Sequence, residues 1–155
     1  MKAWQTLTVA AIAGWLGVMS FFSFLVAPLA FRVIDRTAAA QVVTAVLPRY
    51  YVFGLALCAL ALVGILARAA RGGARGQIPT GILCLLMLAM LTYSLGSVVP
   101  AAEAARAAGD HVAFVRAHRL SVGLNLATIL GGVLVLVLEA FLAGASAQRG
   151  RRSDA

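Results

Sequence analysis

Four long stretches without charge constrain this chain more than any other feature of its sequence. The apolar runs cover residues 3–31, 50–67, 76–102 and 120–138, and the last continues past Glu139 to about residue 147. A helix that crosses a bilayer needs about 20 predominantly apolar residues. Each run therefore has the length of a membrane span, and the pattern predicts spans at about 4–31, 50–68, 78–101 and 117–145.

The composition excludes the common soluble classes. Of 155 residues, 63% are hydrophobic and 12% are charged, whereas soluble domains carry about 45–50% apolar and about 25% charged residues. One small core cannot hide that much apolar surface, which argues against a soluble enzyme, a disordered tail or a disulfide scaffold. Backbone groups in hydrocarbon must be paired within their own segment, and the alternation of a β-barrel is absent. We therefore predict an all-α integral membrane four-helix bundle.

The connection between the first two spans has a helical pattern of its own. Apolar residues recur at helical spacing over residues 35–48, Asp35 or Thr37 can cap the start, and Pro48 is expected to end the run. An apolar face of this kind suits a helix that lies in the membrane interface. The prediction is a short interfacial helix between spans 1 and 2.

The connection before the fourth span is expected to be helical as well. Glu103 and Arg106 have the i,i+3 spacing of an ion pair on one helix. Gly109 can end that helix, and Asp110 can cap the next one. No internal repeat is visible, so we predict one four-span domain over residues 1–147, followed by a basic tail at 148–155.

The net charge of +8 points to lipid and topology rather than to nucleic acid. Twelve of the 13 cations are arginines, and all lie between or beyond the apolar runs. Arginines at such positions meet anionic head groups and set orientation. An even number of spans places both termini on one side, and the bare positive loop at residues 68–75 assigns that side to the cytoplasm. We expect a multi-pass protein of the bacterial inner membrane with both termini cytoplasmic.

Polar residues on the fourth span fall on one helical face. His111, His118, Ser121 and Asn125 advance by 7, 3 and 4 residues, which keeps them aligned at about 100° per residue. Such a face must point into the bundle, because lipid offers no hydrogen-bond partner. Two interpretations stay open: a set of hydrogen bonds that fixes helix packing, or a site for a ligand or a proton.

Further polar groups are expected at the same membrane face as His118. Arg32 and Arg36 follow the first span and, four residues apart, are expected to share a face, while Arg49 and Tyr50 open the second span. The candidate binding cluster consists of Arg32, Arg36, Arg49, Tyr50, His118, Ser121 and Asn125. Its chemistry suits a small anion, a lipid head group or a partner protein, although interfacial arginines also snorkel without binding anything.

Metal binding, haem binding and catalysis have less support from the sequence than the binding cluster has. His111 and His118 lie about 10.5 Å apart along a straight helix, too far to share one ion. Cys58 and Cys84 lie inside apolar runs, where cysteines act as small hydrophobes. The sequence offers no Ser–His–Asp set, phosphate loop or close carboxylate pair. We therefore expect a non-enzymatic protein without a cofactor; the alternative is a copper- or haem-linked protein that uses His118 as the ligand.

Four short motifs, WLGVMSFF, VAPLAFR, LPRYY and HRLSVGLN, occur in this order. Together they resemble the bacterial membrane family catalogued as domain of unknown function 4149, which is similar to animal transmembrane protein 205; a more distant likeness is to the copper-resistance D family. The resemblance implies a small helical membrane protein without an established activity. The residues it singles out are Trp15, Gly17, Pro28, Phe31, Pro48, Tyr50, His118, Ser121 and Asn125.

The expected partners follow from this architecture. The lipid bilayer surrounds the bundle, and nucleic acid has no basic, water-facing domain to bind. Four spans without charged residues at the membrane midplane would need self-association to act as a transporter, so a homo-oligomer is the protein partner to be considered.

Overall fold

The computed structural model describes residues 2–153, with the side chains of residues 2–71 and 76–144. Within these residues every regular element is a helix. Six are α-helices and three are π-helical turns, in the order α1 (Lys2–Phe21), η1 (Phe22–Val26), α2 (Ala27–Val33), α3 (Arg36–Arg68), η2 (Ala69–Gly73), α4 (Ala74–Tyr93), η3 (Ser94–Val98), α5 (Val99–Ala107) and α6 (His111–Ser153). The side chains of the predicted basic tail, 148–155, lie outside the described residues.

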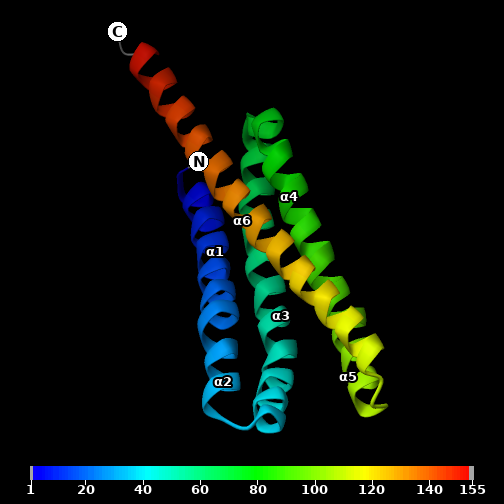
Figure 1. Ribbon diagram of the computed structural model, residues 1–155. Coiled ribbons are helices and arrows are strands. Elements are labelled where there is room, and N and C mark those ends of the chain that lie inside the picture. The colour runs from blue at the N-terminus through cyan, green and yellow to red at the C-terminus, as the bar shows by residue number, and fades with distance from the viewer. Residues whose placement is uncertain (1, 154–155) are drawn as a thin grey trace.

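Consecutive helices join into four rods long and apolar enough to cross a membrane. The rods are Lys2–Val33, Arg36–Arg71, Gly76–Ala107 and His111–Gly144. Figure 1 shows both chain termini and the α3–α4 turn at one end of the bundle, which we call the terminal end. The α2–α3 and α5–α6 turns lie at the opposite end. The predicted all-α four-helix bundle is confirmed.

Two rods contain a π-helical turn just before a proline. Pro28 follows η1 and Pro100 follows η3. A proline has no N–H to donate to the carbonyl four residues earlier, so the ladder of hydrogen bonds must adjust there. In η1 the backbone N–H of Ala27 donates to Phe22 O, five residues back. Both π-helical segments widen their rods toward the end of the bundle where the α2–α3 and α5–α6 turns lie.

The helix predicted at residues 35–48 does form, but its predicted end at Pro48 is wrong. The Asp35 carboxylate caps its start, accepting hydrogen bonds from the backbone N–H groups of Thr37 at 2.8 Å and Ala38 at 3.3 Å. The helix then runs through Pro48 as α3, so no separate interfacial helix precedes the second rod. Prolines are tolerated in membrane helices where other donors serve the disturbed turn. Here the Arg49 guanidinium donates to Ala45 O at 2.9 Å.

The turn between α5 and α6 agrees with its prediction. Gly109 has φ +69°, the left-handed conformation that glycine adopts without strain. Asp110 then caps α6, because its carboxylate accepts a hydrogen bond from Ala113 N at 2.9 Å. The chain reverses here and sends α6 back toward the terminal end (Figure 1).

Close helix packing depends on a few glycines. A Cβ at Gly54 would overlap the Trp15 indole, and one at Gly64 would lie 2.8 Å from Trp4 O. Small residues allow such approach where lipid supplies no hydrophobic drive. The outer face is rich in exposed apolar side chains, among them Leu130 and Phe141. This surface fits a lipid environment and would be unusual on a soluble protein.

Candidate functional site

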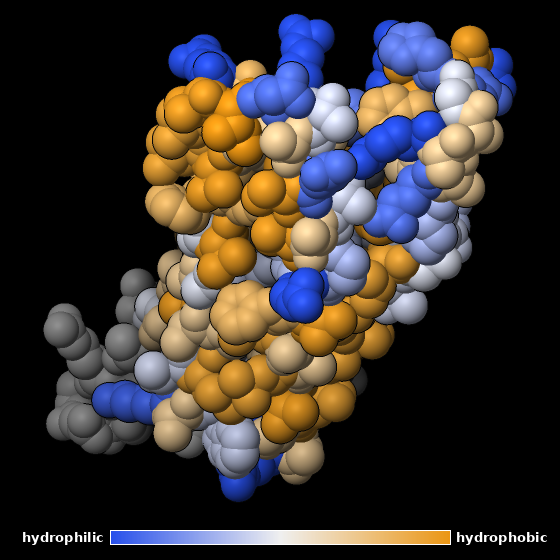
Figure 2. All heavy atoms as spheres, turned by 90° about the horizontal axis from the view of Figure 1, so that it is seen from below, coloured by the Kyte–Doolittle hydropathy of each residue, from blue (hydrophilic) through white to orange (hydrophobic). Residues whose placement is uncertain are grey.

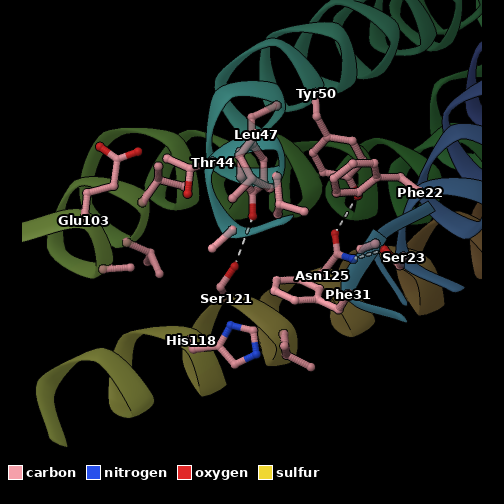
Figure 3. Close-up of a pocket in the computed structure, with 18 of the residues that line it drawn as sticks. Phe22, Ser23, Phe31, Thr44, Leu47, Tyr50, Glu103, His118, Ser121 and Asn125 are labelled. Carbon is pink, nitrogen blue, oxygen red and sulfur yellow. Dashed lines mark hydrogen bonds between the residues drawn. The ribbon is translucent and has the colours of Figure 1, made fainter. Parts of the chain in front are cut away.

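A cavity opens between the helices at the end opposite the termini. It has a volume of about 990 Å³ and is lined by residues of η1, α2, α3, η3, α5 and α6. The α2–α3 and α5–α6 turns lie apart from each other at this end (Figure 1). Much of the lining is apolar, with Phe22, Phe31 and Leu47 among the side chains drawn in Figure 3. Ligand pockets have this size range and this mixture of apolar wall and few polar groups.

The inner wall of the cavity carries a chain of hydrogen bonds between three rods. The Tyr50 hydroxyl donates to Asn125 Oδ1 at 2.8 Å, and Asn125 Nδ2 donates to Ser23 Oγ at 2.9 Å. The hydroxyls of Tyr51 and Ser121 share a further hydrogen bond of 3.2 Å. Figure 3 shows these bonds as dashed lines between α3, α6 and η1. They hold polar groups in place beside the apolar wall.

Aromatic packing fixes the position of Tyr50. Its ring centroid lies 4.8 Å from that of Trp15, 5.1 Å from that of Phe22 and 5.2 Å from that of Tyr51. Tilted and edge-on pairs at such distances are favourable beyond their buried area. This packing holds the Tyr50 ring in place, so its hydroxyl has a fixed position at the cavity.

Three charged side chains and a histidine lie at the mouth of the cavity. Arg36, Glu103, Arg106 and His118 all line it and are all exposed. Figure 2 looks onto this end and shows hydrophilic residues grouped beside broad hydrophobic areas. The cavity therefore has an apolar interior and a charged opening.

The predicted Glu103–Arg106 ion pair is not formed. Arg106 instead donates to Thr44 Oγ1 on α3 at 2.8 Å, and its guanidinium lies 5.4 Å from the centroid of the Phe114 ring. In the part of the chain with described side chains, the one ion pair within 4.0 Å lies at the terminal end. An uncharged hydroxyl and an aromatic face thus hold Arg106 while leaving its charge unneutralised.

Five of the seven predicted cluster residues line this cavity: Arg36, Tyr50, His118, Ser121 and Asn125. Arg32 and Arg49 do not. Arg32 lies in the last turn of α2, and extended Ile34 breaks the helix before Arg36, so the two arginines do not share a helical face as predicted. Arg49 lines a second groove on the α1–α3 side of the bundle. Whether the cluster binds a ligand stays a prediction.

In the part of the chain that the structure describes, neither histidine belongs to a cluster of potential metal ligands. His118 is exposed and stacks on Phe114 with ring centroids 6.0 Å apart. His111 is exposed and lies outside the residues that line the cavity. Among the described residues, no group of three or more His, Cys, Asp or Glu could hold a metal ion. His118 would need ligands from elsewhere.

A second polar feature, at the terminal end, was not predicted. Arg68 donates to both carboxylate oxygens of Glu139, at 2.6 and 2.5 Å, and the two side chains are 6% and 0% exposed. Arg68 also donates to Thr8 Oγ1 at 3.4 Å, and Gln5 Nε2 donates to the Glu139 backbone oxygen at 2.9 Å. Treating Arg68 as part of an open positive loop was wrong. The pair joins α3 to α6 and reaches α1.

One signal in the sequence could have led to this pair. Glu139 is the acid that interrupts the fourth apolar run, and an ionisable residue at membrane depth needs a partner. Arg68 closes the second run, at the same end of the bundle as Glu139. Both spans run toward the terminal end, so the two charges had a common depth.

The fold and these sites define a multi-pass helical membrane protein with a cavity at one end. A family model described as "Domain of unknown function (DUF4149)" matches residues 10–111, and the chain belongs to this family. It is also similar to a protein of Aquifex aeolicus (strain VF5) described as "Uncharacterized protein". The two are 35% identical over 138 residues, which cover 87% of this chain and 98% of that protein. No solved structure matches the chain.

Proposed function

We propose that this protein binds a membrane phospholipid without catalysing a reaction on it. The acyl chain enters the apolar cavity between the four rods, and the phosphate meets the arginines at its mouth. The observation that carries the proposal is the combination of an apolar cavity of about 990 Å³ with guanidinium groups at its opening. A small soluble anion would use the arginines alone, whereas an amphiphile uses both parts.

The charge of the mouth supports a phosphate ligand. Arg36 and Arg106 both line the cavity, and neither is paired with a carboxylate among the described side chains. Guanidinium groups bind phosphate oxygens through charge-assisted hydrogen bonds of fixed geometry. The Ser121 hydroxyl and the Asn125 amide also line the cavity, and the second hydrogen of Asn125 Nδ2 can donate to an ester oxygen of a lipid.

Native mass spectrometry of the purified protein tests this proposal. The protein in detergent is mixed with equal amounts of phosphatidylglycerol and of diacylglycerol with the same acyl chains. We expect phosphatidylglycerol to be retained over diacylglycerol and Arg36→Ala to lower its retention. Arg32→Ala is the matched control, because it removes an exposed arginine at the same end but outside the cavity. Equal losses in both variants, or no phospholipid in the wild type, would contradict the proposal.

The same sample tests the alternative of copper or haem at His118. Elemental analysis and an optical spectrum would reveal a metal or a Soret band, and either finding would favour that alternative. The native mass spectra also give the number of subunits, which tests for a homo-oligomer.

We further propose that the protein resides in a bacterial inner membrane with both termini cytoplasmic and that its family resembles animal transmembrane protein 205 in architecture. Reporter fusions at the C-terminus would test the orientation.

A further inference from the structure

Glu103 lines the cavity on α5, one helical turn before Arg106. Figure 3 shows its carboxylate on the same side of the cavity as Thr44. Opposite charges three residues apart on a helix attract one another and commonly pair. Here they do not pair, because Thr44 and Phe114 hold Arg106.

The mouth of the cavity therefore offers both signs of charge. Among the described side chains Glu103 has no cation within ion-pair distance, and Arg36 has no acid. Both groups are exposed and line the same opening. A phosphate alone would satisfy the arginines and would be repelled by Glu103. A ligand with an anion and a cation a few atoms apart would satisfy all of them.

We propose that Glu103 selects a zwitterionic head group of the phosphoethanolamine type. The phosphate binds Arg36 and Arg106, and the ammonium donates hydrogen bonds to the Glu103 carboxylate. An ammonium carries three N–H donors. The trimethylammonium of a choline head group has none and satisfies a carboxylate less well. This inference rests on the proposed function, since it names the lipid class that the same cavity takes.

A competition between head groups tests the inference. The protein is mixed with equal amounts of phosphatidylethanolamine, phosphatidylglycerol and phosphatidylcholine that share their acyl chains, and native mass spectrometry gives the retained ratios. We expect the wild type to retain phosphatidylethanolamine over the other two. In Glu103→Gln, the ratio of phosphatidylethanolamine to phosphatidylglycerol falls about 1.5- to fivefold, the range of an exposed charge pair. Glu103→Lys shifts the preference to phosphatidylglycerol.

The matched control is Asp110→Asn. It removes an acid at the same end of the bundle, outside the cavity lining, and retains an oxygen that can cap α6. Its lipid ratios should equal those of the wild type. Both acidic positions, Glu103 and Asp110, are exposed, so changes in lipid ratio can be separated from changes in folding.

The outcomes separate this inference from the proposed function. If the wild type retains all three phospholipids equally while Arg36→Ala still lowers total retention, the head-group inference is wrong and the proposed function stands. An unchanged ratio in Glu103→Gln also overturns the inference. If the wild type retains no phospholipid over diacylglycerol, both fail. Preferential binding of soluble glycerophosphoethanolamine over the intact lipid would overturn the assignment to a lipid.

Discussion

The two ends of the bundle treat charge in opposite ways. At the terminal end, Arg68 and Glu139 are buried and satisfy one another through two hydrogen bonds. At the opposite end, Arg36, Glu103 and Arg106 are exposed around a cavity and form no ion pair with any side chain that the structure describes. The first arrangement uses charge to join helices, and the second leaves charge exposed around the cavity.

Helix spacing accounts for the difference. At the terminal end, Gly64 has no side chain, so α3 packs close against α1. A Cβ at Gly64 would lie 2.8 Å from Trp4 O on α1. Thr8 then reaches both Arg68 and the backbone of α3, donating to Ala61 O at 3.3 Å. At the other end, η1 and η3 widen two rods beside the cavity. The same four rods therefore form a closed end and an open one.

The largest expected effect comes from breaking the buried pair. Arg68→Met leaves the Glu139 carboxylate buried without its partner, which we expect to lower the free energy of unfolding by about 3–5 kcal/mol. Thermal unfolding in detergent measures the loss. Combining Arg68→Met with Glu139→Leu removes both charges and should restore most of the stability. A double variant no more stable than the single one would show that the pair does not close this end.

Gly54→Ala tests the packing between the two ends. The new Cβ would overlap the Trp15 indole, which itself supports Tyr50 at the cavity. Overpacking of this kind costs about 1–3 kcal/mol, again measured by thermal unfolding. Gly17→Ala is the control, because a Cβ there meets nothing within 4 Å. Equal stability of the two variants would mean that the contact between α1 and α3 is looser than described.

Tyr50→Phe tests whether the hydrogen bonds at the open end contribute to stability. The change removes the 2.8 Å bond to Asn125 but keeps the ring among Trp15 and Phe22. Hydrogen bonds between membrane helices average about 0.6 kcal/mol, so we expect a small decrease in unfolding free energy. Tyr93→Phe serves as a control on an exposed ring outside the cavity. A loss as large as that of Arg68→Met would remove the contrast between the ends.

The sequence predicts those parts of the fold that depend on length and local chemistry. Four apolar runs of spanning length must form helices, because a helix pairs its backbone N–H and C=O groups within its own segment. The caps at Asp35 and Asp110 follow from the chemistry of their side chains. The sequence was misleading at Pro48, because a proline within a membrane helix is tolerated when neighbouring groups serve the disturbed turn. Local rules favour an end there, whereas the span as a whole continues.

For the candidate site, the sequence predicts the depth of each residue in the membrane. Tyr50 and His118 lie at the start of their predicted spans and Asn125 follows two turns after His118, so the sequence placed all three toward one face, and they line one cavity. The side chains with which they pair were not predictable, because the rotation of each rod about its own axis depends on packing. The pairing of Arg68 with Glu139 and the separation of Arg36 from Arg32 both depend on such three-dimensional detail.

The smallest expected effect concerns the cap of α3 beside Arg36, at the open end. Hydrogen bonds from the backbone N–H groups of Ala38 and then Thr37 lower the pKa of Asp35 below its ordinary value of 3.8. A lowered carboxylate pKa stabilises the fold above pH 3.8, and this contribution is lost as the pH falls through the lowered pKa. Asp35→Ala should therefore reduce hydrogen-exchange protection in the first turn of α3 at neutral pH, without affecting the terminal end.

Asp35→Asn separates the charge from the hydrogen-bond acceptor. Its amide oxygen still caps the helix, so protection of the first turn should stay near that of the wild type and should not change in acid. The wild type should lose protection as the pH falls below the lowered pKa and approach Asp35→Ala. Protection that is the same in all three proteins at neutral pH would mean that the cap does not hold the start of α3. The position of Arg36 at the cavity would then depend on packing of the helix alone.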